Sequence, residues 1–434
     1  MKLAIIADDL TGASDSGAQL AGTGMPTTVL INPAYRGPVE GHHLVVDTDS
    51  RAVSPEEAAL RVREMAFMMK QKGYTAIYKK IDSTMRGNPG AEIEAVDAVF
   101  RPDFVIIAPG YPRNGRQVVD GRLYVDGVPL QETEFARDPG TPVHDGYIPN
   151  LLRGQTSGPI GMVTRNEIRD PDFRLGEKLD ALRAGNIRYV LFDAETEEDL
   201  KWTVNEVIRT GYSVVWAGSA GLASHLPLAR EEVPLRSGNR SVAREDAVLV
   251  VVGSVSGRSR RQLDLLLEQG DVFPVELRSE RLADRPESRR GELLRALSEA
   301  SKAKGRFRNL VLYSSGSPSD VKQALEAGRR RGIRASGVSD AIADALGEAA
   351  LHLHGLFRFK GMVLTGGDTA RRVCTRLRAN TMSLFGEVEE GVPIGLLDGD
   401  REVIAITKAG GFGSDAVLLN AISKLRGEGP TCCP

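Results

Sequence analysis

The chain has 434 residues, of which 41% are hydrophobic and 26% are charged, so ordinary globular domains are expected and fibrous or disordered classes are excluded. Domains of roughly 100–200 residues are typical, which predicts two or three for this length, and we take two. The 56 basic residues nearly balance the 58 acidic ones, leaving a net charge of -2. No sequence-wide field therefore favours nucleic acid or acidic membranes, and a small-molecule partner is expected.

The start of the chain and its few cysteines favour the cytoplasm. The apolar start MKLAII is interrupted by Asp8 and Asp9 before it reaches the length of a signal-peptide core. No apolar run approaches the roughly 18 residues of a membrane-spanning helix. The three cysteines, Cys374, Cys432 and Cys433, have no spacing for a disulfide framework or a zinc site. We expect a cytoplasmic protein without a nucleic-acid or membrane partner.

In the first half of the chain, short β-rich apolar runs alternate with longer amphipathic stretches. The expected strands are Leu3–Ala7, His43–Val46, Ala76–Tyr78, Phe104–Ala108, Tyr189–Phe192 and Ser213–Ala217, and the expected helices include Ser14–Gly22 and Pro55–Gly73. This alternation predicts βαβ units, with a parallel sheet covered by helices. Asp120–Pro149 interrupt the pattern with an LYVDGVPL segment, which predicts a β-hairpin around Asp126-Gly127 beside the substrate site.

A polar stretch without apolar periodicity, AREEVPLRSGNRSVARED at 229–246, predicts a linker. After it, the alternation restarts with the expected strands Ala247–Val252, Asn309–Tyr313, Gly361–Leu364 and Val403–Thr407. We predict an α/β protein of two domains, each a mainly parallel sheet flanked by helices, with the active site in the interdomain cleft. The predicted boundaries are 1–230 for the first domain, 231–246 for the linker, 247–425 for the second domain and 426–434 for a tail.

Polar residues concentrate in the strand-to-helix turns of the first domain. In open parallel sheets, ligands bind beyond the carboxyl ends of the strands, near helix N-termini. These turns read ADDLTGASD at 7–15, DTDSR at 47–51, KKIDSTMRGN at 79–88 and APGYPRNGR at 108–116. Hydroxyls and carboxylates bind a polyol, and arginine or lysine holds a carboxylate, so a small hydroxylated acid is predicted. For any one Asp, Ser or Thr, helix capping remains the alternative.

The corresponding turns of the second domain are small and rich in glycine. They read VGSVSGRSR at 252–260, SSGSPSD at 314–320, TGGDTARR at 365–372 and KAGGFGSD at 408–415. Such turns present backbone N–H groups that cradle phosphates, so a nucleotide is the expected guest. The alternative is that the glycines only permit tight turns.

Other nucleotide and nucleophile motifs fit less well. The P-loop pattern is absent, because no glycine precedes a lysine anywhere in the chain. Gly411-x-Gly413-x-x-Ala416 matches a dinucleotide fingerprint, but no second strand follows to carry the ribose-binding acid, so an anion loop is predicted instead. At Gly253–Gly257 a serine-nucleophile pattern fails, because valine stands in the nucleophile position.

These turns also carry a family resemblance. IADDLTGASD, DTDSR, KKIDSTMRGN and NGR in the first half, and GS-x-S, GGDTA and AGGFG in the second, occur in the order found in the four-carbon acid sugar kinases. The chain resembles this family from residue 3 to residue 425, and within it the D-threonate and D-erythronate kinases. The turn at 108–116 departs from the more apolar turn expected there.

The resemblance implies an N-terminal acid-sugar-binding domain and a C-terminal nucleotide-binding domain. The implied reaction uses ATP and Mg²⁺ to phosphorylate the C4 hydroxyl of D-threonate or D-erythronate in sugar-acid catabolism. The alternatives are a 3-oxo-tetronate kinase, an NAD-dependent sugar-acid oxidoreductase suggested by the Gly411 loop, and a non-catalytic sugar-acid sensor. The sequence does not assign the preferred sugar acid or the Mg²⁺ ligands, and a homodimer is the default expectation.

The resemblance also assigns residues. The implied substrate-binding residues are Asp9, Arg51, Lys80, Asp82, Ser83, Thr84, Met85 and Arg86, and the implied nucleotide-binding residues are Ser254, Ser256, Gly366, Gly367, Asp368, Thr369, Gly410 and Gly411. Phosphoryl transfer depends on positioning, charge neutralisation and exclusion of water, and a carboxylate would accept the hydroxyl proton. Asp9 and Asp82 are the candidates. Adjacent residues in extended chain point opposite ways, so only one of Asp8 and Asp9 is expected to face the substrate, and the resemblance implies that it is Asp9.

Overall fold

The computed structural model describes residues 2–22, 24–39, 41–138, 140–227, 241–243 and 246–428. The chain divides into two compact units: unit 1 comprises Met1–Met25 and His42–Glu231, and unit 2 comprises Pro26–Gly41 and Glu232–Pro434. Most of the predicted linker and the end of the predicted tail lie outside the described residues. Among the described helices, none has the length and apolar character needed to cross a membrane.

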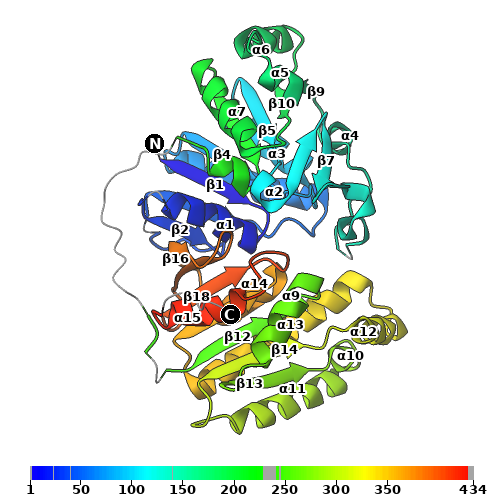
Figure 1. The fold of residues 1–434 in the computed structure, drawn as a ribbon, viewed down its shortest axis with the longest axis vertical. Coiled ribbons are helices and arrows are strands. Elements are labelled where there is room, and N and C mark those ends of the chain that lie inside the picture. Colours follow the sequence, from blue (N-terminus) through cyan, green and yellow to red (C-terminus); the bar gives the residue numbers. More distant parts are fainter. Residues whose placement is uncertain are drawn as a thin grey trace. The chain divides into compact units, whose positions relative to one another are not determined.

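Unit 1 is built on a sheet in which every pairing is parallel (Figure 1). Its strands lie in the order β3 (His43–Asp47), β1 (Leu3–Ala7), β4 (Ala76–Lys80), β11 (Val214–Gly218), β5 (Phe104–Ala108), β10 (Tyr189–Phe192) and β9 (Ile160–Val163). The helices of this unit are α1 (Leu10–Ala21), α2 (Pro55–Gln71), α3 (Pro89–Phe100), α4 (Ile148–Arg153), α5 (Arg165–Arg169), α6 (Leu175–Ala184), α7 (Glu197–Arg209) and α8 (Ala220–Ala223). Every residue of β1 is buried, as expected for a strand covered on both faces.

The predicted hairpin in unit 1 is confirmed. Strands β6 (Arg116–Val119), β7 (Arg122–Val125) and β8 (Val128–Pro129) form a separate antiparallel sheet, followed by short 3₁₀ turns at Leu130–Glu132 and Glu134–Arg137. Asp126 and Gly127 both have positive φ angles, 50° and 80°, which is the turn geometry that Asp-Gly favours in a tight hairpin. Asp193 fastens this excursion to unit 1, because its carboxylate accepts the backbone N–H groups of Asp120 (2.7 Å) and Gly121 (2.9 Å).

Unit 2 has a mixed sheet. Its strands lie in the order β13 (Val272–Leu277), β14 (Asn309–Ser314), β12 (Val248–Val252), β15 (Gly361–Thr365), β18 (Val403–Lys408), β17 (Pro393–Leu397), β16 (Thr381–Glu387) and β2 (Thr27–Leu30). The first five are parallel and the last three continue the sheet with antiparallel pairings. The helices are α9 (Gly257–Leu267), α10 (Ser279–Leu282), α11 (Pro286–Ser301), α12 (Pro318–Arg330), α13 (Ala335–Phe357), α14 (Gly367–Arg376) and α15 (Val417–Leu425).

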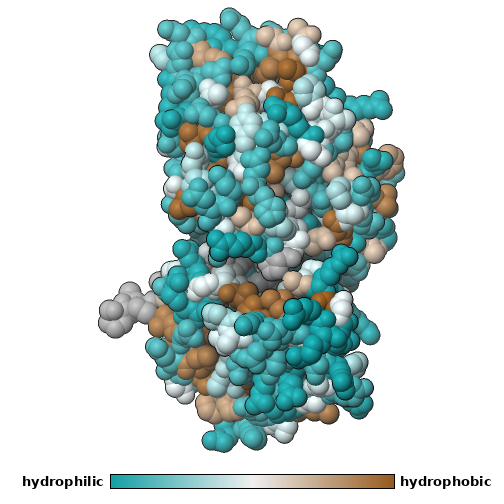
Figure 2. Space-filling view, turned by 90° about the vertical axis from the view of Figure 1, so that its right-hand side faces the viewer, coloured by the Kyte–Doolittle hydropathy of each residue, from teal (hydrophilic) through white to brown (hydrophobic). Residues whose placement is uncertain are grey.

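Hydrophobic burial concentrates in these sheets. The strand β12 reads VLVVV and is fully buried, and it contributes to a core with residues of α9, β15, β18 and α15. On the face drawn in Figure 2, hydrophilic residues predominate and hydrophobic ones form scattered patches. This distribution agrees with the ordinary globular composition of the chain.

All ten strands expected from the sequence are present, with small shifts at their ends, and the predicted α/β class is confirmed. One segment differs from the predicted domain division. Residues 26–41 were expected in the first domain but cluster with unit 2, because β2 pairs antiparallel with β16 at Thr27–Leu30 and Thr381–Leu384. Short antiparallel strands whose partners lie far along the chain carry no local signal of that partnership.

Candidate functional site

The carboxyl ends of the strands in unit 1 bring acidic and basic side chains together. Ala7, the last residue of β1, pairs with Asp47 of β3 on one side and with Lys80 of β4 on the other. The turns that follow these strands therefore start at one edge of the sheet. They carry Asp8 and Asp9, then Arg51, then Asp82 and Arg86, so three of the four polar turns predicted from the sequence meet within unit 1.

Arg51 lies at the centre of this group. Its Nε donates to Asp8 Oδ2 at 2.6 Å, and its Nη2 lies 2.8 Å from Asp9 Oδ1 and 3.7 Å from Asp82 Oδ1. Burial alone would lower the pKa of Arg51, but attraction to the three carboxylates raises it well above its ordinary value. The side chain of Arg51 keeps 17% of its surface exposed, whereas that of Asp8 keeps 4%. The guanidinium thus ties the three turns together and remains partly open.

Asp9 has two structural roles at once. It is the N-cap of α1, because its Oδ1 accepts the backbone N–H of Gly12 at 2.9 Å, and its Oδ2 accepts the hydroxyl of Thr11 at 2.6 Å. The same carboxylate pairs with Arg51, and its side chain is 18% exposed. Asp9 therefore does cap the helix, as the alternative interpretation expected, but its carboxylate is also ion-paired and partly exposed to solvent.

Asp82 is more fully engaged than Asp9. Arg86 holds it in a two-pronged contact, Nε to Oδ2 at 2.9 Å and Nη2 to Oδ1 at 3.0 Å, and the hydroxyl of Thr84 also donates to Oδ2. Burial raises the pKa of Asp82, but Arg86 and Arg51, with the hydrogen bonds from Arg86 and Thr84, hold it well below its ordinary value. Asp82 is therefore an ionised anchor for the arginine beside it.

Residues that follow the hairpin strands contact Arg86 of the same charged cluster. Arg86 Nη1 lies 3.3 Å from Asp138 Oδ2, and the guanidinium carbon lies 5.3 Å from the ring centre of Phe135. Of the other residues predicted in this turn, Met85 is buried with a φ of 59°, a left-handed conformation that is uncommon outside glycine, and Ser83 is half-buried. The turn from Asp82 to Arg86 is thus held in a constrained shape.

Two neighbouring lysines of β4 differ sharply. Lys79 is fully buried and its Nζ lies 2.7 Å from Glu92 Oε2. Burial raises the pKa of Glu92, with repulsion from Asp8 adding to it, although attraction to Lys79 opposes the rise. The Nζ of Lys80 donates to the backbone oxygen of Ile81 at 2.9 Å, and among the described residues no carboxylate pairs with it. A Cβ placed on Gly12 would lie 2.9 Å from Lys80 Nζ and 2.6 Å from Asp9 Oδ1, so the ammonium and Asp9 flank this glycine.

In unit 2, the glycine-rich turns converge at the carboxyl ends of β12, β15 and β18. The hydroxyl of Ser256 donates to the backbone oxygen of Gly410 at 3.0 Å, and a Cβ on Gly410 would lie 2.2 Å from Ser254 Oγ. A Cβ on Gly253 would lie 2.0 Å from Thr369 Oγ1. Gly366 has a φ of 98°, which L side chains rarely adopt, and it precedes the first turn of α14. That turn holds the other predicted residues of this loop, Gly367, Asp368 and Thr369, and Gly411 follows Gly410 after β18.

Three residues at these turns were not singled out from the sequence. Ser259 Oγ donates to the backbone oxygen of Gly410 at 3.0 Å, and Arg258 Nη1 donates to that of Gly411 at 3.2 Å. Lys408, the last residue of β18, is 1% exposed, and its Nζ donates to the backbone oxygen of Ala409 at 2.9 Å. Burial, with repulsion from Arg258, lowers the pKa of Lys408 to about 7. A lysine ending an apolar strand directly before a glycine-rich turn was the available sequence signal.

The two groups differ in what they can hold. The glycines let these turns pack closely, because a Cβ on Gly410 would overlap Ser254 Oγ, and the backbone N–H groups of such small turns suit a phosphate chain. No group of three or more His, Cys, Asp or Glu side chains suited to a metal ion occurs within the described parts of the chain. Mg²⁺ is ordinarily held by one or two carboxylates together with nucleotide phosphates, so a preformed cluster is not required for it.

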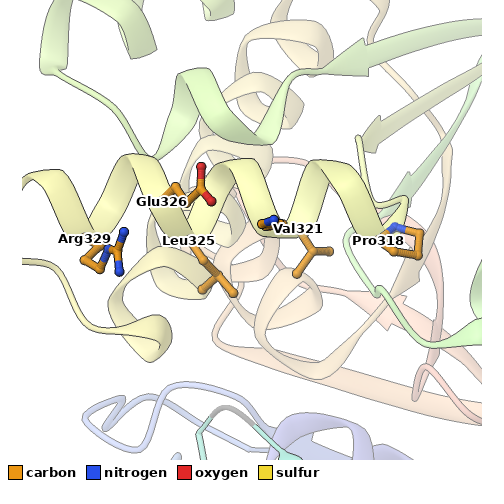
Figure 3. A pocket seen from close by; sticks show the side chains of 6 residues that line it. Pro318, Val321, Leu325, Glu326 and Arg329 are labelled. Carbon is orange, nitrogen blue, oxygen red and sulfur yellow. The ribbon is translucent and has the colours of Figure 1, made fainter.

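Two surface hollows lie away from these residues. One runs along α12 and is lined by Pro318, Val321, Lys322, Leu325, Glu326 and Arg329, all from that helix (Figure 3). Another, in unit 1, lies between the α5–α6 region and α7 and includes Phe173 and Trp202. Neither hollow contains a residue predicted to bind the sugar acid or the nucleotide.

Comparisons with known proteins match both units. Residues 3–226 match the family model of a sugar-binding N-terminal domain, and residues 249–418 match that of a nucleotide-binding C-terminal domain. The chain is 32% identical to a D-threonate kinase of Salmonella typhimurium, over 97% of this chain and 98% of the relative. It is 31% identical to a D-erythronate kinase of Heliobacterium modesticaldum, covering 97% and 96% of the two chains, and 29% identical to a 3-oxo-tetronate kinase of Cupriavidus necator, covering 98% of each.

Solved structures share the fold. A protein of Salmonella typhimurium LT2 described as a tRNA synthase superposes with a TM-score of 0.78 at 23% identity, covering 96% of this chain and 98% of the other. A Haemophilus influenzae protein superposes with a TM-score of 0.68 at 23% identity, covering 97% and 100%. At these identities the likeness supports the architecture described above and carries no statement about activity.

Proposed function

Because the chain belongs to the four-carbon acid sugar kinase family, with its sugar-binding N-terminal and nucleotide-binding C-terminal domains, we propose that it is an ATP-dependent kinase of a four-carbon sugar acid. The proposed reaction transfers the γ-phosphate of Mg-ATP to the C4 hydroxyl, and D-threonate or D-erythronate is the proposed acceptor. 3-Oxo-tetronate stays an alternative acceptor, since a relative acting on it is nearly as similar.

The observation that carries this proposal is the division of chemistry between the units. In unit 1, carboxylates, an arginine pair and a lysine for which the described residues offer no carboxylate partner surround the ends of β1, β3 and β4. In unit 2, glycines and serines surround the ends of β12, β15 and β18. The first set suits hydroxyl and carboxylate groups of a small acid, and the second suits phosphates.

Within unit 1, we assign the role of orienting or deprotonating the acceptor hydroxyl to Asp9. Asp82 is the weaker candidate, because Arg86 and Arg51 hold its pKa well below its ordinary value despite its burial, which makes it a poor proton acceptor. Asp9 keeps the more exposed side chain, 18% against 11% for Asp82. A base must come within hydrogen-bond reach of the proton that it accepts, so exposure favours Asp9.

For the carboxylate of the sugar acid, we assign Lys80 together with Arg51. Arg51 already balances Asp8 and Asp9, so its charge is largely compensated before any substrate binds. The ammonium of Lys80 lies next to Gly12 and Asp9 and has no carboxylate partner among the described residues. An added carboxylate would supply that partner.

The test is ADP release from Mg-ATP with D-threonate, D-erythronate and 3-oxo-tetronate as separate acceptors. Acceptor-dependent ADP release with one of the three is expected, and phosphorus NMR of the product would place the phosphate at C4. If the protein binds a sugar acid but never releases ADP, a sensor is indicated and the proposal fails. Reduction of a nicotinamide cofactor by a sugar acid would indicate the oxidoreductase alternative instead.

A further inference from the structure

Lys408 stands out in unit 2 as a buried cation with no acidic partner in the described part of the chain. Its side chain is 1% exposed at the end of β18, beside Thr365 at the end of β15 in the strand register. An ammonium group has three donors, and the described partners of Nζ are two backbone oxygens, those of Ala409 (2.9 Å) and Gly410 (3.4 Å). Buried charges are ordinarily paired, so this site lacks a negative charge.

The charged groups nearest to Lys408 do not supply that charge. Glu389 attracts the ammonium, but its carboxylate accepts the N–H of Ser414 (2.6 Å), the Ser414 hydroxyl (2.8 Å) and the side-chain amide of Asn420 (2.8 Å). Arg258 repels the ammonium. The neighbours of the ammonium are therefore a repelling cation, an occupied carboxylate and neutral backbone.

The surroundings of Lys408 are also those of a phosphate site. The Gly410 oxygen, which Nζ approaches, is the point on which Ser256 and Ser259 also converge. The hydroxyl of Thr365 is buried without a hydrogen-bond partner among the described residues, so a second polar group at these strand ends is unsatisfied. A bound anion would accept hydrogen bonds here from both the N–H groups of the turns and the adjacent ammonium group.

We infer that Lys408 is a phosphate-binding residue of unit 2, whose ammonium contacts the phosphate chain of the nucleotide and neutralises part of its charge. This inference rests on the proposed kinase function. It adds a buried ammonium group to the backbone N–H groups and hydroxyls of the glycine-rich turns. Such a contact positions the nucleotide for phosphoryl transfer, which depends mainly on positioning and charge neutralisation.

The first experiment is calorimetric titration of Mg-ATP into wild-type protein, Lys408→Met and Lys360→Met. Lys360 is an exposed lysine directly before β15, at the opposite end of the parallel strands, so its replacement changes the net charge equally without touching the turns. We expect Lys408→Met to weaken ATP binding roughly tenfold or more, the scale of a hydrogen bond to a charged group, and Lys360→Met to bind ATP as the wild type does. A folded Lys408→Met protein with wild-type ATP affinity overturns the inference.

The pH dependence of ATP affinity supplies a second readout that a purely structural role would not move. The phosphate chain binds the protonated amine, so affinity should fall as pH rises from about 7 to about 9 in the wild type and change much less in Lys408→Met. Should Lys408→Met not fold, the wild-type profile decides, and an affinity constant over that range overturns the inference. Wild-type protein that binds no ATP at all would instead sink the proposed function.

Discussion

The two units place different chemistry on the same architectural feature, the carboxyl edge of a parallel sheet. In unit 1 the turns carry full charges that neutralise one another, as in the contacts of Arg51 with Asp8 and Asp9. In unit 2 the turns around Gly366 and Gly410 are small and nearly neutral. A sugar acid offers hydroxyls and a single carboxylate, which require directed polar groups, whereas a phosphate chain brings its own charge and needs backbone donors and space.

Two buried lysines make the comparison concrete. Lys79 of unit 1 and Lys408 of unit 2 both lie at the end of a parallel strand with almost no exposed surface. Lys79 has Glu92 at 2.7 Å, whereas Lys408 has only backbone oxygens within hydrogen-bond distance among the described residues. The first is a completed ion pair within the fold, and the second is the kind of charge that a ligand completes.

The largest expected effect is on the stability of unit 1. Lys79→Met leaves the carboxylate of Glu92 buried without its cation, which should lower the free energy of unfolding by about 3–5 kcal/mol. Both tryptophans of the chain, Trp202 and Trp216, belong to unit 1, so tryptophan fluorescence during urea unfolding reports on this unit. The double variant Lys79→Met with Glu92→Leu should recover most of the loss. If Lys79→Met alone unfolds at the wild-type urea concentration, the pair is not a structural one.

The next effect concerns catalysis and separates the two roles of Asp9. Asparagine caps helices about as well as aspartate, so Asp9→Asn should keep the start of α1 and the melting temperature nearly unchanged. Loss of the carboxylate should reduce kcat by roughly 10²-fold, the scale of acid–base assistance. Asp170→Asn is a matched control, because Asp170 is an exposed carboxylate of unit 1 that accepts the N–H of Asp172. Near-normal kcat in Asp9→Asn would leave Asp9 only its capping role.

A smaller effect is expected on substrate affinity. Lys80→Met should raise the KM for the sugar acid roughly tenfold, with little change in the KM for ATP, because the substrate carboxylate loses its cation. Lys72→Met provides the control, since Lys72 is an exposed lysine at the end of α2 and its loss changes the net charge equally. An increase in the KM for ATP alone would move Lys80 to the nucleotide side of the reaction.

The sequence predicted the strands and the turns well for a physical reason. Parallel strands buried on both faces, such as LAIIA at β1 and VLVVV at β12, are continuous apolar runs, and the turns after them stand out as polar or glycine-rich. The Asp126-Gly127 hairpin was equally visible, because its dihedral angles demand such residues. These features are encoded within a few neighbouring residues.

What the sequence did not reveal depends on residues far apart along the chain. The pairing of β2 with β16 joins segments from opposite ends of the sequence, so the expected boundary of the first domain included residues 26–41, which cluster with unit 2. The contrast between Lys79 and Lys408 depends on whether a helix elsewhere in the chain places a carboxylate beside the ammonium group. Glu92 of α3 does this for Lys79, and no described residue does it for Lys408. Likewise, the ion pair between Arg86 and Asp82, which favours Asp9 as the base, depends on side-chain geometry. The spacing of four residues permits this ion pair but does not specify it.

The smallest expected effect tests the uncompensated charge of Lys408 without any ligand. Its pKa is lowered to about 7 in the folded protein, whereas an unfolded lysine titrates near 10.4, so between these values the unfolded chain binds the additional proton. Stability therefore rises with pH across this window, in the direction opposite to that of a lysine held by a carboxylate. We expect a gain on the order of 1 kcal/mol in the free energy of unfolding of unit 2 between about pH 7 and about pH 8.5, relative to Lys408→Met.

Scanning calorimetry at both pH values would measure this gain, with tryptophan fluorescence identifying the transition of unit 1. Saturating Mg-ATP should remove the gain, because bound phosphate favours the protonated amine. A wild-type transition of unit 2 that parallels Lys408→Met at both pH values would mean that the ammonium is already compensated within the fold, and the contrast with Lys79 would then disappear.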